Sequence, residues 1–554
     1  MPILLSDILQ SDQKKAVEAA SGLLTNVKVI DGRTIKRRPD GAVANTRFYE
    51  GDHWQNGTGY IGAKPLTTHG FNQTMAQLKE GFVSENVIKE IDDRHVAGVF
   101  GREPLWGFVP QKLPSQSSIT RRRKFSKIFN VLSSAIGAAK EFLGQSADPR
   151  AQEADDALTV WWDRAEPRQK LKEALRVCLN EERALLRLFV PRGLRDENGE
   201  IPRQKSLTEA LSLIHIDVVC SDKGGVFIDS NTQKPFGLYV YKADQSTCVE
   251  LSYVNDSGQT VLQVLSDNPA LAVEPIAYAM QGRLWMHEVV RPALITEQIR
   301  SEQRALNLTK TKLTRNVNMA GDLERAIMNA ERPKKKVRVA DSSQASGYRE
   351  ETVDSEYLTG AGVTNLVTGL LIKDADGKII GRANPNISYR NPVPIDTFVG
   401  TRAECRESML GQAQQLHIMI SGDSTVSGRS REQARGEYRG SLKDSKEPFD
   451  GAGRWIIEAP LWLAAQFCDR TSEFAHLRGV FDCVIEDGPI SPEERAANRE
   501  DVKAKLLSPE SAMSRNGVED TDAELARIAE SENNGTAMPP PQPPPPNGDS
   551  QLIQ

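Results

Sequence analysis

The segment from Pro394 to Ile420 most constrains how this chain can fold. Its apolar residues recur at helical spacing, but the stripe they form is thin because polar Arg402 and Gln412 interrupt it. A helix over this segment would be roughly 40 Å long, and so thin a stripe cannot bury it within one chain. We therefore expect this helix to pack side by side with neighbours, including helices from other subunits. The stripe consists of Phe398, Cys405, Met409, Leu416 and Ile420.

Length, charge and hydropathy bound the class of protein. The chain has 554 residues, which is too many for one hydrophobic core, so we expect two or three structural regions. The formal net charge is −5, so any nucleic-acid surface must be local. No stretch is apolar for long enough to span a membrane, and the first residues lack the basic start of a secretory signal. The sequence therefore indicates a soluble globular protein.

Cysteine and histidine residues form no cluster that indicates a disulfide framework or a metal site. The six cysteines contain no C-x-x-C pair, which favours reduced thiols in a cytoplasmic setting. The seven histidines form neither H-x-x-x-H nor H-E-x-x-H, and the chain has no G-x-x-x-x-G-K-[ST] motif. We therefore expect a protein that is not an enzyme and that holds no metal or cofactor. The cysteines are Cys178, Cys220, Cys248, Cys405, Cys468 and Cys483.

Three short motifs look like ligand sites but are better explained as loops and turns. Residues 57–62 fit G-x-G-x-x-G, but no apolar strand precedes them, so we expect a flexible loop. Asp374 to Lys378 and Asp196 to Glu200 resemble the start of calcium loops. Neither has the remaining ligands at the required spacing, which favours hairpin turns.

The spacing of apolar residues predicts helices in the first third of the chain and strands after it. Helices are expected at 8–24, at 82–99 and in two amphipathic segments of 152–189, around Trp161-Trp162 and from Leu171 to Phe189. From about 205 to 290 the period changes to two, which predicts an antiparallel β region with turns at Gly224-Gly225 and at Asn255 to Gly258. The segment 115–150 is basic at its start and then rich in Ser and Ala, and we expect it to be mobile or helical.

The second half returns to helices around a strand-rich insert. Residues 293–331 are predicted to be helical, and 332–393 to form strands and loops. A charged helix over 429–447 should continue into an apolar helix over 449–468 that kinks near Pro460. Short helices follow over 490–530, and the Pro-rich tail is extended or disordered.

A small polar loop, Ser421 to Gly428, leads directly into a basic helix. Ser430 and Gln433 fit a capping box, which predicts that the helix starts here. The cations that follow recur at steps of two or four residues, so most share one face. They form either a solvated helix face or a sequence-independent contact to phosphates. These residues are Arg429, Arg431, Arg435, Arg439 and Lys443.

A second basic run, Lys334-Lys335-Lys336-Val337-Arg338, lies inside the strand-rich insert. It would pass as a nuclear-import signal, but nothing else in the sequence indicates a nuclear protein. We interpret it as a solvated or phosphate-facing patch.

The order of these elements resembles that of tailed-bacteriophage portal proteins. The resemblance covers roughly residues 45–530 and is mainly one of architecture. It includes the block Phe48 to Gly51, followed by the helix that contains Ser84 to Lys89. It implies an α+β fold, mainly helical, with an antiparallel β-rich wing, long stem helices, a small α/β clip and a helical crown. The implied regions are an N-terminal arm (1–45), the wing (46–291), a first stem helix (292–331), the clip (332–393), a second stem helix (394–420), the tunnel loop (421–428), a kinked wing helix with its return segment (429–489), the crown (490–530) and the tail (531–554).

The resemblance also implies a function. Portal proteins form a ring, usually of twelve subunits, at one capsid vertex, through which double-stranded DNA is packaged and later ejected. The implied partners are further copies of the chain, DNA bound without sequence preference, the terminase large subunit, head–tail adaptor proteins, and the major capsid and scaffolding proteins. The protein would reside in the virion and assemble in the cytoplasm of a bacterial host. The alternative is another virion ring or head–tail adaptor protein without a DNA-translocating tunnel loop.

The resemblance assigns roles to particular residues. The small uncharged side chains of the loop suit weak, sliding contact with DNA, and the arginines after it could grip phosphates. The clip would carry the basic patch Lys334, Lys335, Lys336 and Arg338. The tunnel loop would comprise Ser421, Gly422, Asp423, Ser424, Thr425, Val426, Ser427 and Gly428, with phosphate contacts from Arg429, Arg431, Arg435 and Arg439.

Overall fold

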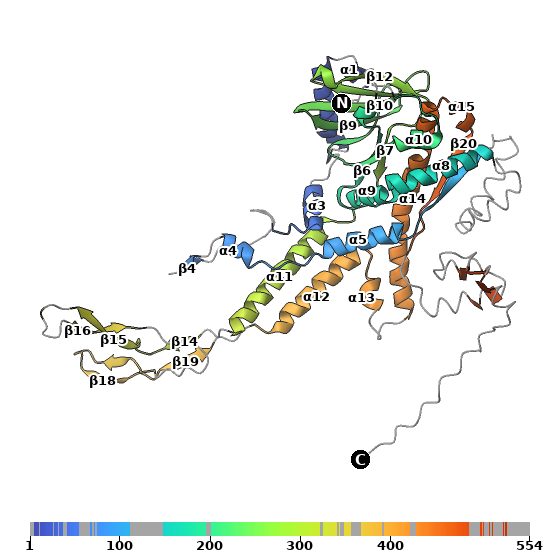
Figure 1. Ribbon diagram of the computed structural model, residues 1–554. Helices are drawn as coiled ribbons and strands as arrows, with labels where there is room; N and C mark the ends of the chain where they lie inside the picture. Colours follow the sequence, from blue (N-terminus) through green and yellow to red (C-terminus); the bar gives the residue numbers. More distant parts are fainter. Residues whose placement is uncertain are drawn as a thin grey trace. The chain divides into compact units, whose positions relative to one another are not determined.

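The computed structural model divides the chain into two compact units (Figure 1). Unit 1 consists of Met1–Glu50, Ile88–Glu297 and Leu410–Gln554, and unit 2 consists of Gly51–Val87 and Gln298–Met409. The structure describes residues 5–9, 12–25, 27–30, 33–36, 41–54, 67–68, 71–72, 75–110, 148–195, 201–321, 325–340, 343, 348–355, 367–389, 393–421, 428–486, 499–500, 502–503, 509, 512–513, 524–525 and 527–528.

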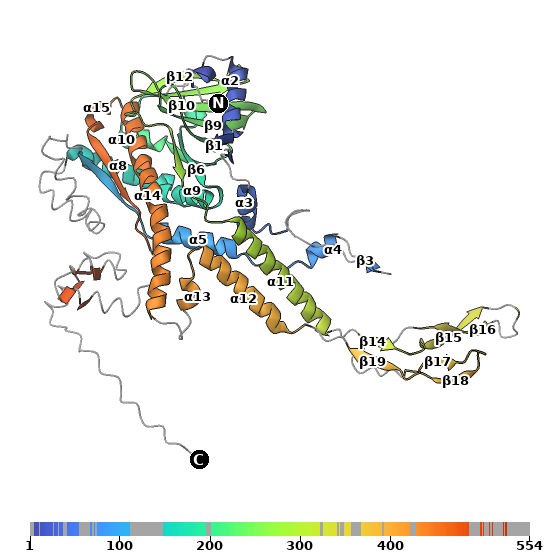
Figure 2. The same ribbon diagram turned by 180° about the vertical axis from the view of Figure 1, so that it is seen from behind.

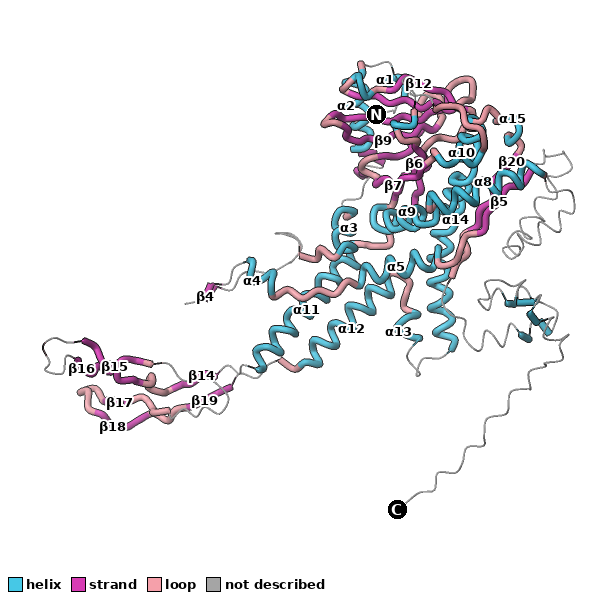
Figure 3. Tube along the Cα trace, viewed as in Figure 1, coloured by secondary structure: helices cyan, strands magenta, loops and turns pink. Residues whose placement is uncertain are grey.

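Helices and antiparallel strands occur in both units, so the predicted α+β class is confirmed (Figure 3). All strand pairs among the described residues are antiparallel. The finer, portal-type description of the fold remains a proposal.

A five-stranded sheet forms one part of unit 1, in the order β12-β11-β10-β9-β8. The period-two pattern predicted β9, β10 and β11 correctly. The turn predicted at Gly224-Gly225 was wrong, because both glycines belong to β8, where they pair with Tyr239 and Leu238 of β9. In the turn between β10 and β11, the amide of Gly258 donates to the carbonyl of Asn255, and Gly258 has a φ of +76° that favours glycine. The strands are β8 (Gly224–Ile228), β9 (Pro235–Ala243), β10 (Ser246–Val254), β11 (Thr260–Ser266) and β12 (Val273–Tyr278).

The N-terminal helices α1 (Leu5–Leu9) and α2 (Gln13–Thr25) pack on this sheet. The apolar residues of α2 repeat at three- and four-residue steps and therefore share one helix face. The segment predicted as an arm thus begins with helices that belong to the core of unit 1. The cluster joins Ile8, Ala16, Val17, Ala20 and Leu24 to Phe227, Phe236, Leu238, Val249, Leu251 and Leu265.

A three-stranded sheet, in the order β13-β6-β7, also belongs to unit 1. Its central strand corrects one prediction, because residues 183–189 are a strand and not the end of a helix. Glu182 adopts a left-handed backbone conformation (φ 68°) that ends the preceding helix. Ala184, Leu185 and Leu186 are consecutive and all buried, so both strand faces are covered. The strands are β6 (Arg183–Phe189), β7 (His215–Cys220) and β13 (Met286–Val290).

Helices form most of the remainder of unit 1 (Figure 2). The helices predicted around Trp161-Trp162 and from Leu171 are confirmed, and the helix predicted over 82–99 is present but begins only at Val87. The long helix after the polar loop is continuous, with Pro448 and Pro460 inside it. The elements are α3 (Ala42–Glu50), α5 (Val87–Phe100), α8 (Pro149–Ala165), α9 (Pro167–Glu181), α10 (Leu207–Ser212), α13 (His417–Ser421), α14 (Gly428–Phe467) and α15 (Thr471–Phe474), with paired strands β1 (Val27–Ile30) and β2 (Arg33–Lys36), and β5 (Leu105–Pro110) and β20 (Leu477–Asp482).

Unit 2 contains two long helices and several two-stranded ribbons. The first helix is shorter than the predicted 292–331: it ends at Gly321, and residues 325–328 pair as a strand. The strand-rich insert predicted at 332–393 is confirmed. The elements are β3 (Thr67–Thr68), β4 (Phe71–Asn72), α4 (Met75–Glu80), α11 (Glu297–Gly321), β14 (Arg325–Met328), β15 (Lys334–Ala340), β16 (Tyr348–Asp354), β17 (Leu371–Lys373), β18 (Ile379–Arg382), β19 (Asn386–Tyr389) and α12 (Ile395–Gln412).

Polar contacts explain why the stripe of α12 is interrupted. Arg402 forms two hydrogen bonds with Glu85, both 2.9 Å long, and Arg406 and Lys310 bind the same carboxylate at 3.1 and 3.3 Å. Burial works to raise the pKa of Glu85, but Arg402 and Lys310 outweigh it, so the pKa lies below its ordinary value. The polar residue Arg402, which interrupts the apolar stripe in the sequence, therefore forms an ionic contact within unit 2.

Candidate nucleic-acid interface

The helix predicted over residues 394–420 is interrupted before it reaches the polar loop. α12 ends at Gln412, and the separate short helix α13 begins at His417. Between them Gln414 adopts a left-handed backbone conformation with a φ of 57°, which a right-handed helix cannot contain. The prediction of one continuous helix was wrong because apolar spacing carries no information about this turn.

The side chain of Gln415 holds the turn in place within unit 1. It is fully buried. Its Nε2 donates to the carbonyl of Ile91 at 2.8 Å, and its Oε1 accepts from Arg94 Nη1 at 3.0 Å. Both partners lie on α5, and a buried amide satisfied at both ends restricts the backbone strongly. The direction in which α13 leaves the turn is therefore set by α5, a role that no motif around Gln415 indicated.

Helices α13 and α14 lie side by side (Figure 2), and an aromatic contact joins them. The His417 ring stacks on the Tyr438 ring, with centroids 4.5 Å apart and planes inclined by 27°. The Tyr438 hydroxyl donates to the carbonyl of Arg94 at 2.9 Å. These contacts place the two helices that flank the polar loop beside each other.

The structure shortens the predicted loop at both ends. Ser421 is the last residue of α13, and Gly428 is the first residue of α14, so both are helical. The remaining loop residues Gly422, Asp423, Ser424, Thr425, Val426 and Ser427 lie outside the described residues.

The predicted basic stripe lies on α14, where each described cation directly follows a residue of the buried face. Arg439 and Lys443 are exposed and Arg435 is half-buried. Arg429 and Arg431 lie in the same helix, but their side chains are outside the described set. The buried face consists of Ala434, Tyr438, Ser441, Leu442 and Ser445.

Close packing on α5 fixes the orientation of this helix. A Cβ at Gly98 would lie 2.7 Å from Leu442 Cδ2 and from the Tyr438 hydroxyl, so a larger residue there would have to displace these side-chain ends. Further along, the hydroxyl of Ser445 lies 2.7 Å from His95 Nε2 and 2.6 Å from the Nε of Arg291. α14 is thus fixed on one face while Arg439 and Lys443 stay exposed.

A buried acid, Asp92, lies on the same helix α5. Asn180 donates to its Oδ2 at 2.7 Å, and its Oδ1 has no hydrogen-bond partner among the described residues. Burial raises the pKa of Asp92 to about 7, against the lowering effects of Asn180 and Arg291. The sequence did not single out Asp92, because an acid at this spacing looks like any exposed helix position.

The stability of the chain should therefore depend on the protonation of Asp92. A group whose folded pKa is raised stabilises the fold fully below its unfolded pKa of 3.8, and that stability is lost as pH rises toward 7. Asp92→Asn cannot ionise. Relative to Asp92→Asn, the wild type should lose about 2 to 3 kcal/mol of unfolding free energy between pH 5 and pH 8.

Urea unfolding of both chains at several pH values measures this difference. His95 and His287 have lowered pKa values and titrate in both chains. Their contribution to the pH dependence of the unfolding free energy therefore cancels when the two chains are compared. Asp156→Asn on α8 removes a carboxylate from an exposed position and is the matched control. A difference that does not change with pH would show that Asp92 is ionised throughout.

The second basic run lies on strand β15 of unit 2. Lys334, Lys335, Lys336 and Arg338 are all exposed. The partner strand β16 is acidic, and its register sets Lys334 opposite Asp354 and Arg338 opposite Glu350. Phosphate approaching these cations would therefore also meet carboxylates, which weakens the phosphate-facing interpretation.

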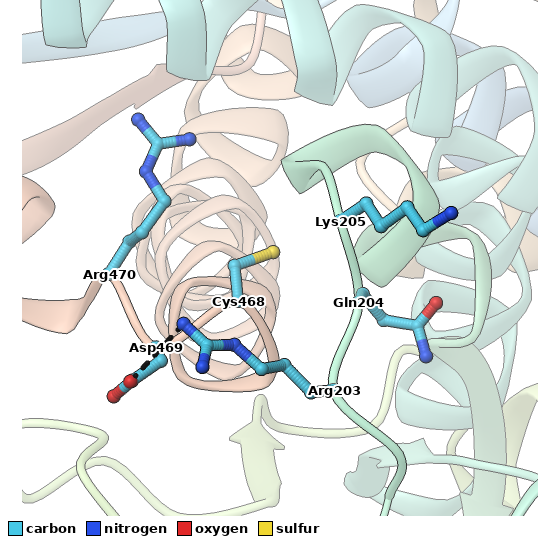
Figure 4. A pocket seen from close by; sticks show the side chains of 6 residues that line it. All are labelled: Arg203, Gln204, Lys205, Cys468, Asp469 and Arg470. Carbon is cyan, nitrogen blue, oxygen red and sulfur yellow. Dashed lines mark ion pairs between the residues drawn. The ribbon is translucent and has the colours of Figure 1, made fainter.

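A pocket in unit 1 has the cations and the thiol that would attract a ligand (Figure 4). Arg470 is bound by Glu153 at 2.7 Å and by Glu473 at 2.9 Å, and Arg203 pairs with Asp469 at 3.4 Å. Burial raises the pKa of the Cys468 thiol, which keeps it protonated and unreactive. We assign no function to this pocket, whose lining is Arg203, Gln204, Lys205, Cys468, Asp469 and Arg470.

The other motifs have different outcomes. Asp374 forms the predicted turn: its Oδ1 accepts from the amides of Asp376 and Lys378, between β17 and β18. Residues 57–62 and 196–200, and nearly all of 115–150, lie outside the described residues, as do most of 490–530 and the tail. Within the described part of the chain, no three His, Cys, Asp or Glu side chains are arranged to hold a metal ion.

Comparison with models of known protein families and with curated protein sequences finds no match to this chain. Among the residues that the structure describes, no helix combines the length and the apolar character that crossing a membrane requires.

Proposed function

We propose that this chain is the portal protein of a tailed bacteriophage: a ring at one capsid vertex through which double-stranded DNA enters and leaves. One observation carries the proposal. A turn fixed by Gln415 and a stacked pair, His417 and Tyr438, bring two helices together at a polar loop, and two exposed cations of the basic stripe follow on the second helix. In a ring, such a stripe would repeat around a channel and contact phosphates without reading sequence.

The long helices of unit 2 support a ring in a second way. The first turns of α12 expose Ile395 and Val399, and α11 exposes Val317 near its end. Exposed apolar side chains on neighbouring long helices call for lateral partners. Head-to-tail contacts that close into a ring give every subunit a lateral partner on each side.

The proposed partners follow from this function. They are further copies of the chain, double-stranded DNA, the terminase large subunit, head–tail adaptors, and the capsid and scaffolding proteins. The chain would act without catalysis or cofactor, assemble in the bacterial cytoplasm and reside in the virion.

Electron microscopy and light scattering of the purified full-length chain test the ring. Closed rings of uniform mass are expected, and a monomer under all solution conditions would remove the proposal. A ring that assembles but plays no part in DNA passage would instead favour the adaptor alternative.

Deleting Thr425, Val426 and Ser427 tests the loop itself. The ring should remain assembled, because the contacts of α13 and α14 lie outside the deletion. Packaging should fall, because loop residues would no longer reach the DNA. Asp423, the one charged residue of the loop, is kept in this variant. Filled and empty capsids counted after complementation give the result, and normal packaging would remove the role of the loop.

A further inference from the structure

A cluster of buried polar side chains joins α5, α9 and α14 of unit 1. Asp92 of α5 and Asn180 of α9 share one hydrogen bond, in which the amide Nδ2 donates to the carboxyl Oδ2 at 2.7 Å. The same Nδ2 donates to the carbonyl of Arg176 at 2.9 Å, so two acceptors fix the direction of the amide. Asp92 and Asn180 are 0% and 4% exposed. The pair is therefore held in a place where each polar atom needs a partner.

Two oxygens of this pair lack a donor. Asp92 Oδ1 and Asn180 Oδ1 are buried and have no hydrogen-bond partner among the described residues. A carboxylate can only accept hydrogen bonds, whereas a protonated carboxyl group has one O–H to donate. A proton on Asp92 therefore supplies the donor that the pair lacks. Burial raises the pKa of Asp92 to about 7, so both protonation states are reached near neutral pH.

Arg291, which follows β13, is a buried cation without a counter-ion in the described part of the chain. It is 6% exposed. Its Nε donates to Ser445 Oγ of α14 at 2.6 Å, and its Nη1 donates to the carbonyl of Pro292 at 2.9 Å, so both acceptors are neutral. Burial lowers the pKa of Arg291, and three neighbouring groups act against this effect. These groups are Cys178, Asp92 and Asp444.

We infer that Asp92, Arg291 and Ser445 form a proton-controlled switch that sets how firmly α14 is held on α5. While Asp92 is protonated, Arg291 stays on Ser445. When Asp92 releases its proton to solvent, the buried carboxylate needs a cation, and the Arg291 guanidinium turns from Ser445 to Asp92. Outside its own helix, Ser445 then keeps its contact with His95, at 2.7 Å, as its described hydrogen bond. α14 is therefore held more loosely at alkaline pH than at acidic pH.

Other charged groups around Asp92 are paired or solvated. Arg176 of α9 pairs with Asp93 at 3.3 Å, and these side chains are 36% and 39% exposed. Asp444 of α14 is exposed, so water solvates its carboxylate. Among the described groups that act on Asp92, Arg291 is thus the buried cation that an ionised carboxylate would attract.

The neighbouring titratable groups His95, Cys178 and Tyr49 keep their charge state between pH 6 and pH 8. Burial lowers the pKa of His95 to about 3. Burial raises the pKa of Cys178 and that of Tyr49 to about 12. A change in this pH range that is local to the cluster therefore reports on Asp92.

Hydrogen exchange of the α14 amides around Ser445 tests the switch in the full-length chain. Protection is corrected for the intrinsic pH dependence of exchange. In the wild type it should fall by about tenfold from pH 6 to pH 8, because Asp92 changes from mostly protonated to mostly ionised. The amides of α11 in unit 2 are the internal reference, and their protection should not change.

Three substitutions separate the parts of the switch. Asp92→Asn cannot ionise, so protection of α14 should be as high at pH 8 as at pH 6. Arg291→Gln removes the cation that moves, so protection should not depend on pH although Asp92 still titrates. Ser445→Ala removes the contact itself and should give low protection at both pH values. Asp156→Asn removes an exposed carboxylate of α8 and should behave like the wild type. Circular dichroism shows that each chain is folded.

The outcomes that would overturn the switch are specific. Unchanged protection of α14 in the wild type would do so, as would a fall with pH that persists in Asp92→Asn or Arg291→Gln. An equal fall in α11 would show that the whole chain loses stability, and it would overturn the switch as well. If Arg291→Gln does not fold, Ser445→Ala decides, because a fall with pH in that chain cannot come from the Ser445 contact. The readout is local to α14, so either result is independent of the proposed ring.

Discussion

Replacing Arg439 and Lys443 with glutamate should abolish DNA retention while leaving the ring assembled. Both side chains are exposed on α14 and lie four residues apart, so they share one face. The buried face of the helix, which includes Tyr438 and Leu442, is untouched, so the helix should keep its place on α5. The change replaces attraction for phosphate by repulsion in every subunit. Filled capsids should therefore fall to background.

Binding of a DNA fragment to purified rings at several salt concentrations measures the same effect. The slope of log affinity against log salt should become less steep by about one for each phosphate that the ring no longer binds. Glu437→Lys with Glu447→Lys reverses two exposed acids of the same helix and is the matched control, with binding at least as tight as that of the wild type. Unchanged retention and an unchanged slope in Arg439→Glu with Lys443→Glu would show that the stripe is only a solvated helix face.

Glu250→Ala should destabilise unit 1 by about 3 to 5 kcal/mol, because it leaves a buried guanidinium without its counter-charge. Arg187 of β6 binds both oxygens of Glu250 on β10, at 2.9 and 2.5 Å, and the two side chains are 13% and 5% exposed. Arg187 also lies over the rings of Phe189 and Tyr239, at 4.8 and 4.7 Å from their centroids. This pair thus joins a strand of the three-stranded sheet to one of the five-stranded sheet.

A double substitution separates two contributions to the free energy of unfolding: the penalty for leaving one buried charge unpaired, and the net stabilisation by the ion pair. Arg187→Met with Glu250→Leu removes both charges at similar volume and should restore most of the stability that Glu250→Ala removes. Asp256→Asn is the control at an exposed pair with Lys234, and it should change stability by less than about 1 kcal/mol. Urea unfolding followed by tryptophan fluorescence gives the values. A double variant as unstable as Glu250→Ala would mean that packing, and not charge, sets the cost.

Periodicity predicted most elements of the fold where one face is buried by neighbours nearby in the sequence. β9, β10 and β11 were placed correctly, although each of them also buries consecutive residues. It failed at residues 183–189, where consecutive apolar residues suit a buried helix and a central strand equally well. It failed again at 413–416, where the break depends on hydrogen bonds from Gln415 to α5, more than three hundred residues earlier in the chain.

The proposed site divides in the same way. The sequence by itself determined that a polar loop leads into a helix with cations at four-residue steps, because helical spacing alone places these residues on one face. Only the tertiary structure decided that Arg439 and Lys443 of this face are exposed, because the adjoining face is held on α5 through Gly98, Ser445 and Tyr438. It likewise decided that the basic run of β15 lies beside an acidic strand, because pairing with β16 depends on residues that no local pattern connects.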